Sequence, residues 1–205
     1  DDPDYAYLSI QPNWSARGSR NLLSNMTILR AAKNNEVAIR VATSQDFANR
    51  GMKSSLRISK VKFLKVRAST YSVAQLFDSD ILMDEVLMEQ CRAVPSGALV
   101  LLNRSVLTVD RSVFRNNEAR GGSGHGILQA STSEVHVLNS TFTNNMGGAV
   151  YFHADGRGSI HHSTFARNMF IRPSVEELAS HTPEFTVFHA PHFEAEDASL
   201  NSQCF

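Results

Sequence analysis

His125 stands between two glycines in the stretch SGHGI, and Asp110 lies upstream of it. An imidazole and a carboxylate are the groups that general acid–base chemistry uses to move protons. Hydrolysis of a glycosidic bond with inversion, however, needs one carboxylic acid and one carboxylate. Asp110 is the lone aspartate in the region where a partner would be expected. The residues therefore predict no catalytic site, and His125 with Asp110 is the pair that an enzyme would have to use.

Two groups of histidines could bind zinc if the fold brought them together, namely His161 with His162 and His189 with His192. Adjacent histidines on a strand point to opposite faces, which argues against the first pair. The chain also has no phosphate-binding loop, no CxxC pair and no aspartate cluster with calcium-ligand spacing. We predict neither a metal site nor a cofactor.

The two cysteines, Cys91 and Cys204, are far apart in the sequence. One disulfide would tie the C-terminal tail to the body, but two free buried thiols fit the sequence equally well. Four sequons for N-glycosylation are compatible with a secreted glycoprotein, although about two would arise by chance at this content of Asn, Ser and Thr. Their asparagines are Asn13, Asn25, Asn103 and Asn139.

The 205 residues include 20 basic and 20 acidic side chains, and 42% of the residues are hydrophobic. A neutral chain has no overall field to attract nucleic acid, so we expect no nucleic-acid partner. The local basic stretch KVKFLKVR, from Lys60 to Arg67, fits the solvent face of a strand. No apolar run has the length of a membrane span.

A repeat dominates the second half of the chain. Three segments, 107–117, 135–145 and 158–168, share one template: an apolar residue, Ser, Phe and Asn in constant register. The aligned positions are Val109, Val137 and Ile160; Ser112, Ser140 and Ser163; Phe114, Phe142 and Phe165; and Asn117, Asn145 and Asn168. Fainter copies precede them, with Ile58, Val61 and Phe63 in one and LLSNMTI (22–28) as another.

A unit of this length cannot bury its own apolar face, and stacking of copies solves that problem. Its short alternating runs of β-branched and aromatic residues indicate strands. We therefore predict an all-β fold, a right-handed parallel β-helix, in which the phenylalanines form one column. The asparagines should take the left-handed backbone of a tight bend and bond to one another between coils. Gly147 and Gly148 should let the chain turn before the next strand.

The same residues resemble a known family. FRNN, FTNN and FARN match the FxxN motif, and GGAV at 147–150 matches the GGA[ILV] motif, of the chlamydial polymorphic outer membrane proteins and of related β-helix proteins in algae and protists. The resemblance implies a surface role in adhesion or extracellular assembly, and it implies no catalytic residues. The GHG of 124–126 is similar to the Gly-His-Gly of polygalacturonase-type β-helix hydrolases, but their Asn-Thr-Asp, Asp-Asp and Arg-Ile-Lys motifs are missing.

We interpret the chain as one β-helix domain, 1–205, with its clearest repeats in 98–170. Apolar residues at helical spacing in 79–92 predict an inserted helix, and RPSVEELAS (172–180) predicts a short helix within a C-terminal cap and tail, 172–205. The opening DDPDYAYLSI has neither an initiator Met nor a signal-like segment, which indicates a processed form or a fragment of a longer chain.

The best functional hypothesis is a non-catalytic extracellular or cell-surface module that acts as a structural subunit or adhesin and binds protein or glycan. The first alternative is a carbohydrate-active enzyme of the polygalacturonase or lyase type. The second is an accessory structural subunit of a larger complex in an organelle lumen.

Overall fold

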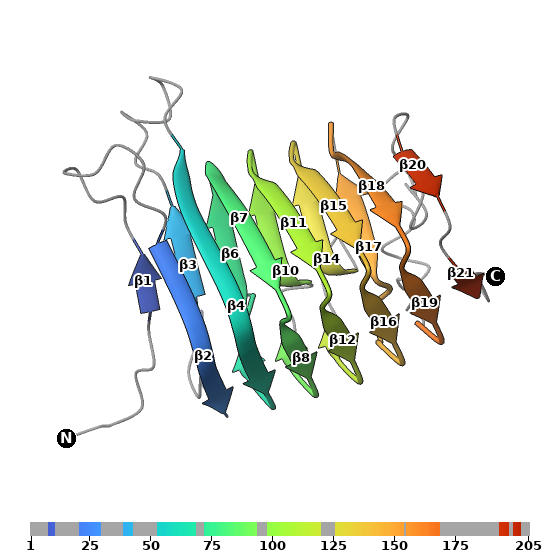
Figure 1. The fold of residues 1–205 in the computed structure, drawn as a ribbon, viewed down its shortest axis with the longest axis horizontal. Helices are drawn as coiled ribbons and strands as arrows, with labels where there is room; N and C mark the ends of the chain where they lie inside the picture. Colours follow the sequence, from blue (N-terminus) through green and yellow to red (C-terminus); the bar gives the residue numbers. More distant parts are fainter. Residues whose placement is uncertain are drawn as a thin grey trace, which may run out of the picture.

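The structure is a computed structural model of the whole chain. It describes residues 8–10, 21–29, 39–42, 53–68, 72–93, 98–119, 126–153, 155–168, 193–196 and 199–201. Within these ranges every element is a strand, and every strand pairing is parallel. The strands follow one another in three sheets, so the chain winds as a parallel β-solenoid (Figure 1).

The first sheet has six strands in the order β1 (Leu8–Ile10), β3 (Ile39–Ala42), β6 (Ala74–Phe77), β10 (Ala98–Asn103), β14 (Gly126–Ser131) and β17 (Val150–His153). The second and largest sheet bends along its length, so that one coil contributes two strands to it. Its strands on one side of the bend are β7 (Ser79–Asp84), β11 (Val106–Asp110), β15 (Glu134–Leu138), β18 (Arg157–His161) and β20 (Phe193–Glu196). On the other side they are β8 (Leu87–Glu89), β12 (Val113–Arg115), β16 (Thr141–Thr143), β19 (Thr164–Ala166) and β21 (Ser199–Asn201).

β4 (Ser54–Leu64) runs through the bend and pairs with both β7 and β8, and β2 (Asn21–Leu29) pairs along its other edge (Figure 1). The third sheet is small, with β5 (Arg67–Ala68), β9 (Arg92–Ala93) and β13 (Glu118–Ala119). Successive coils thus lie one strand spacing apart, about 4.8 Å.

The predicted phenylalanine column is present. Phe114 pairs in register with Phe142, and Phe142 with Phe165. Their ring centroids are 4.5 and 4.9 Å apart, with interplanar angles of 3° and 4°. Phe114 and Phe142 are fully buried, and the column continues through Met88 to Phe63 in the two preceding coils. The predicted slot of Val109, Val137 and Ile160 is also confirmed by the register.

The amide ladder exists, but the left-handed backbone belongs to the preceding residue. Asn116, Asn144 and Arg167 have φ of 55°, 53° and 54°. The asparagine that follows each of them points inward. Asn117 donates from its backbone N to Oδ1 of Asn145 at 3.0 Å, and Asn145 donates likewise to Asn168 at 3.2 Å. The prediction was right about the ladder and wrong by one residue about the bend.

The coil has three such corners, where the chain bends between strands. At the other two corners the side chain that accepts the inward backbone N–H is a serine. At one corner Ser112 N donates to Ser140 Oγ, and Ser140 N to Ser163 Oγ, both at 3.0 Å. At the other corner Ser79 N donates to Ser105 Oγ, and Ser105 N to Ser133 Oγ, both at 3.1 Å. Each of these four inward N–H groups therefore finds its acceptor on a side chain of the next coil, in a core where an unpaired donor would be costly.

The inserted helix predicted for 79–92 is wrong, because that segment forms β7, β8 and β9. Its inward residues are Ser79, Ile81, Met83, Val86, Met88 and Cys91, all buried. Alternation with period two is broken by a left-handed residue at Glu85 and another at Gln90, both with φ of 53°. Inward positions therefore step by three residues across a bend, and this step imitates the spacing of a helix. The C-terminal helix predicted for 172–180 lies outside the described residues.

The structure explains why the first residue of the GGAV motif, Gly147, is a glycine. Its φ is 110°, and a Cβ there would lie 2.0 Å from the carbonyl oxygen of Ala119 in the preceding coil. The coils could not approach this closely with any side chain at that position. Gly148 follows with φ of 79°, so the turn before β17 uses both glycines, as the sequence predicts.

We expect Phe142→Ala to lower the free energy of unfolding by about 3–5 kcal/mol, because it removes a fully buried ring from the middle of the column. Urea denaturation followed by circular dichroism measures the change. The neighbouring substitution Thr143→Ala, at a partly exposed position, is the control and should change it by less than about 0.5 kcal/mol. Equal effects of the two substitutions would contradict the column as a source of stability.

Asn145→Ala should lower the free energy of unfolding by at least about 2 kcal/mol. It removes the Oδ1 that accepts from both the backbone N and the Nδ2 of Asn117, and each buried donor left unpaired costs about 1–3 kcal/mol. Asn144→Gly, one residue earlier, is the control. Glycine accepts the left-handed backbone there, so stability should stay within about 0.5 kcal/mol of the parent chain.

Candidate functional site

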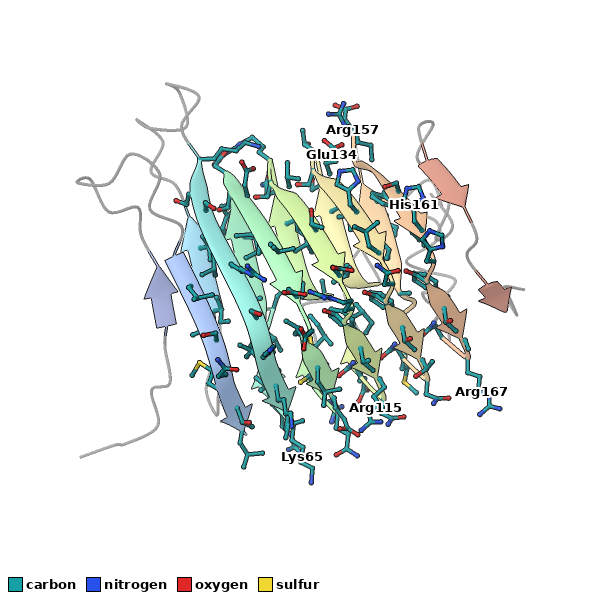
Figure 2. All side chains as sticks on the ribbon, in the orientation of Figure 1. Lys65, Arg115, Glu134, Arg157, His161 and Arg167 are labelled. Atoms are coloured by element: carbon teal, nitrogen blue, oxygen red, sulfur yellow. The ribbon has the colours of Figure 1, made fainter. Side chains whose placement is uncertain are left out.

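The outer face of β4, β7, β11, β15 and β18 carries several polar side chains that could do chemistry. Outward side chains on parallel strands in register form rows across the coils, one residue per coil. One row consists of Ser55, Asp80, Val106, Glu134 and Arg157. The next consists of Arg57, Leu82, Thr108, His136 and Ser159, and the third of Ser59, Asp84, Asp110, Leu138 and His161. Figure 2 shows Glu134 and Arg157 together at the upper edge of the second sheet, whereas Lys65, Arg115 and Arg167 lie at its lower edge, beyond the bend.

Asp84 is the most enclosed charge on this face, with only 4% of its side chain exposed. Arg57 of the preceding coil donates from Nη2 to its Oδ2 at 2.7 Å, and Arg111 of the following coil donates from Nη2 to its Oδ1 at 2.5 Å. One carboxylate thereby connects three consecutive coils. The sequence does not reveal this cluster, because the apolar spacing in 79–92 predicts a helix, whereas the segment forms strands.

The arginines also set the protonation of the carboxyl groups. Burial of Asp84 favours its neutral form, but hydrogen bonds from Arg57 and Arg111 outweigh burial and hold its pKa below the usual value. The hydrogen bond from Arg104 lowers the pKa of Asp78 in the same way. Both carboxyl groups are therefore ionised at neutral pH and cannot donate a proton as general acids.

Asp110 lies directly beside Asp84 in the next coil, because the two residues are paired in register. Its Oδ1 accepts from Asn139 Nδ2 at 3.0 Å, and its Oδ2 lies 3.4 Å from Arg111 Nε. Two carboxylates thus occur on adjacent coils of one face, although Asp84 is enclosed and Asp110 has 26% of its side chain exposed. His125, the predicted partner of Asp110, lies outside the described residues.

Residues of the described sequons lie at corners of the coil or in its serine ladders. Asn25 and Asn139 are exposed left-handed corner residues with φ of 53° and 47°. In the sequon of Asn103 the serine is Ser105, which is buried in a serine ladder, and the sequon of Asn139 contains Ser140, which is buried likewise. Asn25, Asn139, Ser105 and Ser140 thus occupy structural positions at the bends of the coil. Asn13 lies outside the described residues.

Cys91 is a free, buried thiol that occupies the asparagine slot of its coil. Its Sγ donates to the carbonyl oxygen of Phe63 at 3.4 Å, and burial raises its pKa to about 11. A thiol with such a pKa is unreactive at neutral pH. Cys204, its predicted partner, lies outside the described residues.

No group of three or more His, Cys, Asp or Glu side chains that could hold a metal ion occurs in the part of the chain that the structure describes. His161 faces outward on β18, and His162 is an exposed corner residue with φ of 48°. The HAPH histidines, His189 and His192, lie outside that part. The described residues also contain no helix long and apolar enough to cross a membrane.

The parallel coils, the inward ladders and the charged outer rows define a β-solenoid protein. Comparison with known families gives the particular group: the family described as right-handed β-helix region matches residues 15–176. The chain belongs to this right-handed β-helix family, which confirms the fold class predicted from the repeat. No solved structure matches the chain.

A second family, phosphoenolpyruvate carboxykinase, matches residues 157–204. The phosphoenolpyruvate carboxykinase (ATP) of Brevibacillus brevis is 56% identical over 46 residues, which cover 22% of this chain and 9% of that enzyme. The enzyme of the same name from Geobacillus thermodenitrificans is 57% identical over 37 residues, 18% of this chain and 7% of the enzyme. The chain therefore spans less than a tenth of the length of these relatives. The two family matches overlap in 157–176, where the last Phe and Asn of the repeat lie.

Asp84→Asn should lower the free energy of unfolding at pH 7 by about 1–3 kcal/mol, because it removes the charge that both arginines bind. The folded-state pKa of Asp84 is below its unfolded value of about 4, so its contribution is complete only above about pH 5. The contribution disappears as the pH falls through the folded-state pKa. Urea melts of both chains from pH 7 down to pH 2.5 should therefore show the difference shrinking at the acid end.

The matched control is Asp80→Asn, because Asp80 is 55% exposed and pairs with the exposed Lys53 at 3.3 Å. An exposed pair of this kind contributes about 0–1 kcal/mol. A difference between Asp84→Asn and the parent chain that did not change between pH 7 and pH 2.5 would contradict the assignment.

Proposed function

We propose that the chain is a non-catalytic β-helix module that acts as a structural subunit or adhesin and binds a protein or glycan partner on its outer face. Its setting is the cell surface or the extracellular space, in line with the resemblance to the polymorphic outer membrane proteins. One observation carries the proposal: each acidic side chain described between residues 53 and 134 forms an ion pair with a basic side chain. These acids are Asp78, Asp80, Asp84, Glu85, Glu89, Asp110, Glu118 and Glu134.

Such pairing supports binding more than glycoside hydrolysis. A glycosidase needs a carboxyl group that is protonated at neutral pH and free to approach the leaving oxygen. Asp78, Asp84 and Glu134 have lowered pKa values and are held as carboxylates by arginine, whereas a flat face with alternating donors and acceptors can hydrogen-bond a partner. The polar rows of β7, β11, β15 and β18 are the part of the surface that we assign to this partner.

A carbohydrate-active enzyme is the second candidate, and the adjacency of Asp84 and Asp110 is the observation that favours it. Neighbouring strands place such side chains close enough to act on the two sides of one bond, as a pair of catalytic carboxylates must. The enclosure of Asp84 between two arginines argues against this candidate. The segment shared with the carboxykinases covers too little of those enzymes to support a carboxykinase activity.

Binding of the full chain to a glycan array and to intact cells tests the first candidate. Thr108→Arg places a bulky charge in the middle of the assigned face and should weaken binding at least about tenfold. Leu101→Arg, at a partly exposed position on β10 in the first sheet, should leave it unchanged. Equal binding by both variants would contradict the assigned face.

Release of reducing ends from polygalacturonate and related polymers tests the second candidate. We expect none above the buffer blank. Release that Asp110→Asn abolishes would overturn the non-catalytic proposal.

A further inference from the structure

Three outward side chains of β15 and β18 form a hydrogen-bonded chain. His136 and Ser159 are paired in register on the two strands, and His136 Nδ1 lies 2.8 Å from Ser159 Oγ. The other ring nitrogen of His136, Nε2, lies 3.1 Å from Glu134 Oε1. The order hydroxyl, imidazole, carboxylate is the arrangement in which a base activates a nucleophile and an acid orients the base.

Glu134 determines which ring nitrogen of His136 is the base. Its Oε2 accepts from Arg157 Nη2 at 3.0 Å, and this hydrogen bond lowers the pKa of Glu134, so the carboxylate is ionised at neutral pH. An ionised carboxylate accepts a hydrogen bond and has none to donate, so the neutral imidazole places its proton on Nε2. Nδ1 then has a free lone pair directed at the hydroxyl of Ser159.

The three side chains are open to a small reagent. His136 has 33% and Glu134 30% of the side chain exposed, and Ser159 is half-buried on the same face. The nearby Arg157 is 62% exposed and has further N–H groups besides the one that Glu134 accepts. The site therefore has a nucleophile, a base with a fixed tautomer, and a cation beside them.

We propose that Ser159 is an activated nucleophile that accepts an acyl group from an activated ester, an aryl ester or a thioester. Ser159 Oγ forms a bond to the acyl carbon and transfers its proton to His136 Nδ1. The bond from the acyl carbon to the leaving oxygen or sulfur breaks, and the leaving group departs as the alcohol or thiol with the proton from His136. The product is a serine ester on the outer face of β18.

The adduct should form once per chain without turnover. Strands β15 and β18 lie inside a parallel sheet, where their backbone N–H groups take part in ladders to neighbouring strands. Those groups therefore do not form the oxyanion hole, each donor of which accelerates acyl transfer by about 10²–10³. This reactivity goes beyond the proposed binding role, and neither proposal depends on the other.

Labelling of the full chain with a biotinylated fluorophosphonate, followed by peptide mass mapping, tests the proposal. Phosphonylation forms a bond between Ser159 Oγ and phosphorus and releases fluoride. We expect one label per chain at Ser159, none in Ser159→Ala, and a rate at least about 10² lower in His136→Gln, because the general base is lost. Glu134→Gln should lower the rate about tenfold, since the imidazole is no longer held in its tautomer. p-Nitrophenyl acetate should give a burst of about one equivalent and no steady state.

Thr143→Ser is the matched control. It puts a serine hydroxyl on an outward position of β16, between Arg115 and Ala166 and with no imidazole opposite. This serine should remain unlabelled. Nitrogen NMR of the His136 ring, which should report a proton on Nε2, keeps the test valid if the His136→Gln variant does not fold. Absence of label at Ser159, or equal labelling in a folded His136→Gln chain, would overturn the proposal.

Discussion

The constraint on which this fold depends is the fate of the backbone N–H groups that turn into the core at the corners. A left-handed residue at each corner turns the chain, and the residue after it points inward, where its N–H has no strand to pair with. Serine and asparagine of the next coil supply the acceptor. Val86 and Cys91 illustrate the direction of the ladder, because they donate to Ser112 Oγ at 3.0 Å and Asn117 Oδ1 at 2.9 Å and provide no acceptor themselves.

The register between coils provides acceptors for the inward N–H groups, and it also determines which side chains are neighbours on the outer surface. A side chain on the outer face has its nearest neighbours on the adjacent coils. Charged residues that are separated in the sequence by about the length of one coil therefore form ion pairs. Arg57 and Asp84 are 27 residues apart, as are Asp84 and Arg111, and Asp78 with Arg104 and Glu89 with Arg115 are 26 apart. Single exposed pairs contribute little, but pairs repeated along the coils give an ordered, charge-paired surface. The part of that surface on β7, β11, β15 and β18 carries both functional proposals.

Much of the fold could be predicted from the sequence, because side chains with the same role recur at the same position in each coil. Phe114, Phe142 and Phe165, with their serines and asparagines, define the coil length and the inward face without any structure. The prediction failed in 79–92, where Met88 replaces Phe and Cys91 replaces Asn, so that the coil no longer shows its motif. It also placed the left-handed backbone on Asn145 rather than on Asn144, since both are asparagines and only coordinates distinguish them.

The candidate sites were much less predictable. Asp110 could be identified as a candidate from the sequence, but its neighbour Asp84 and the arginines around Asp84 could not. These side chains meet across coils, and the coils differ in length. Ser159 and His136 are 23 residues apart, whereas Arg57 and Asp84 are 27 apart, so no single spacing finds both. The residue types alone show which positions repeat, and therefore that the chain must stack on itself. Which outward side chains meet depends on the number of residues in each bend, and this becomes known only from the folded chain.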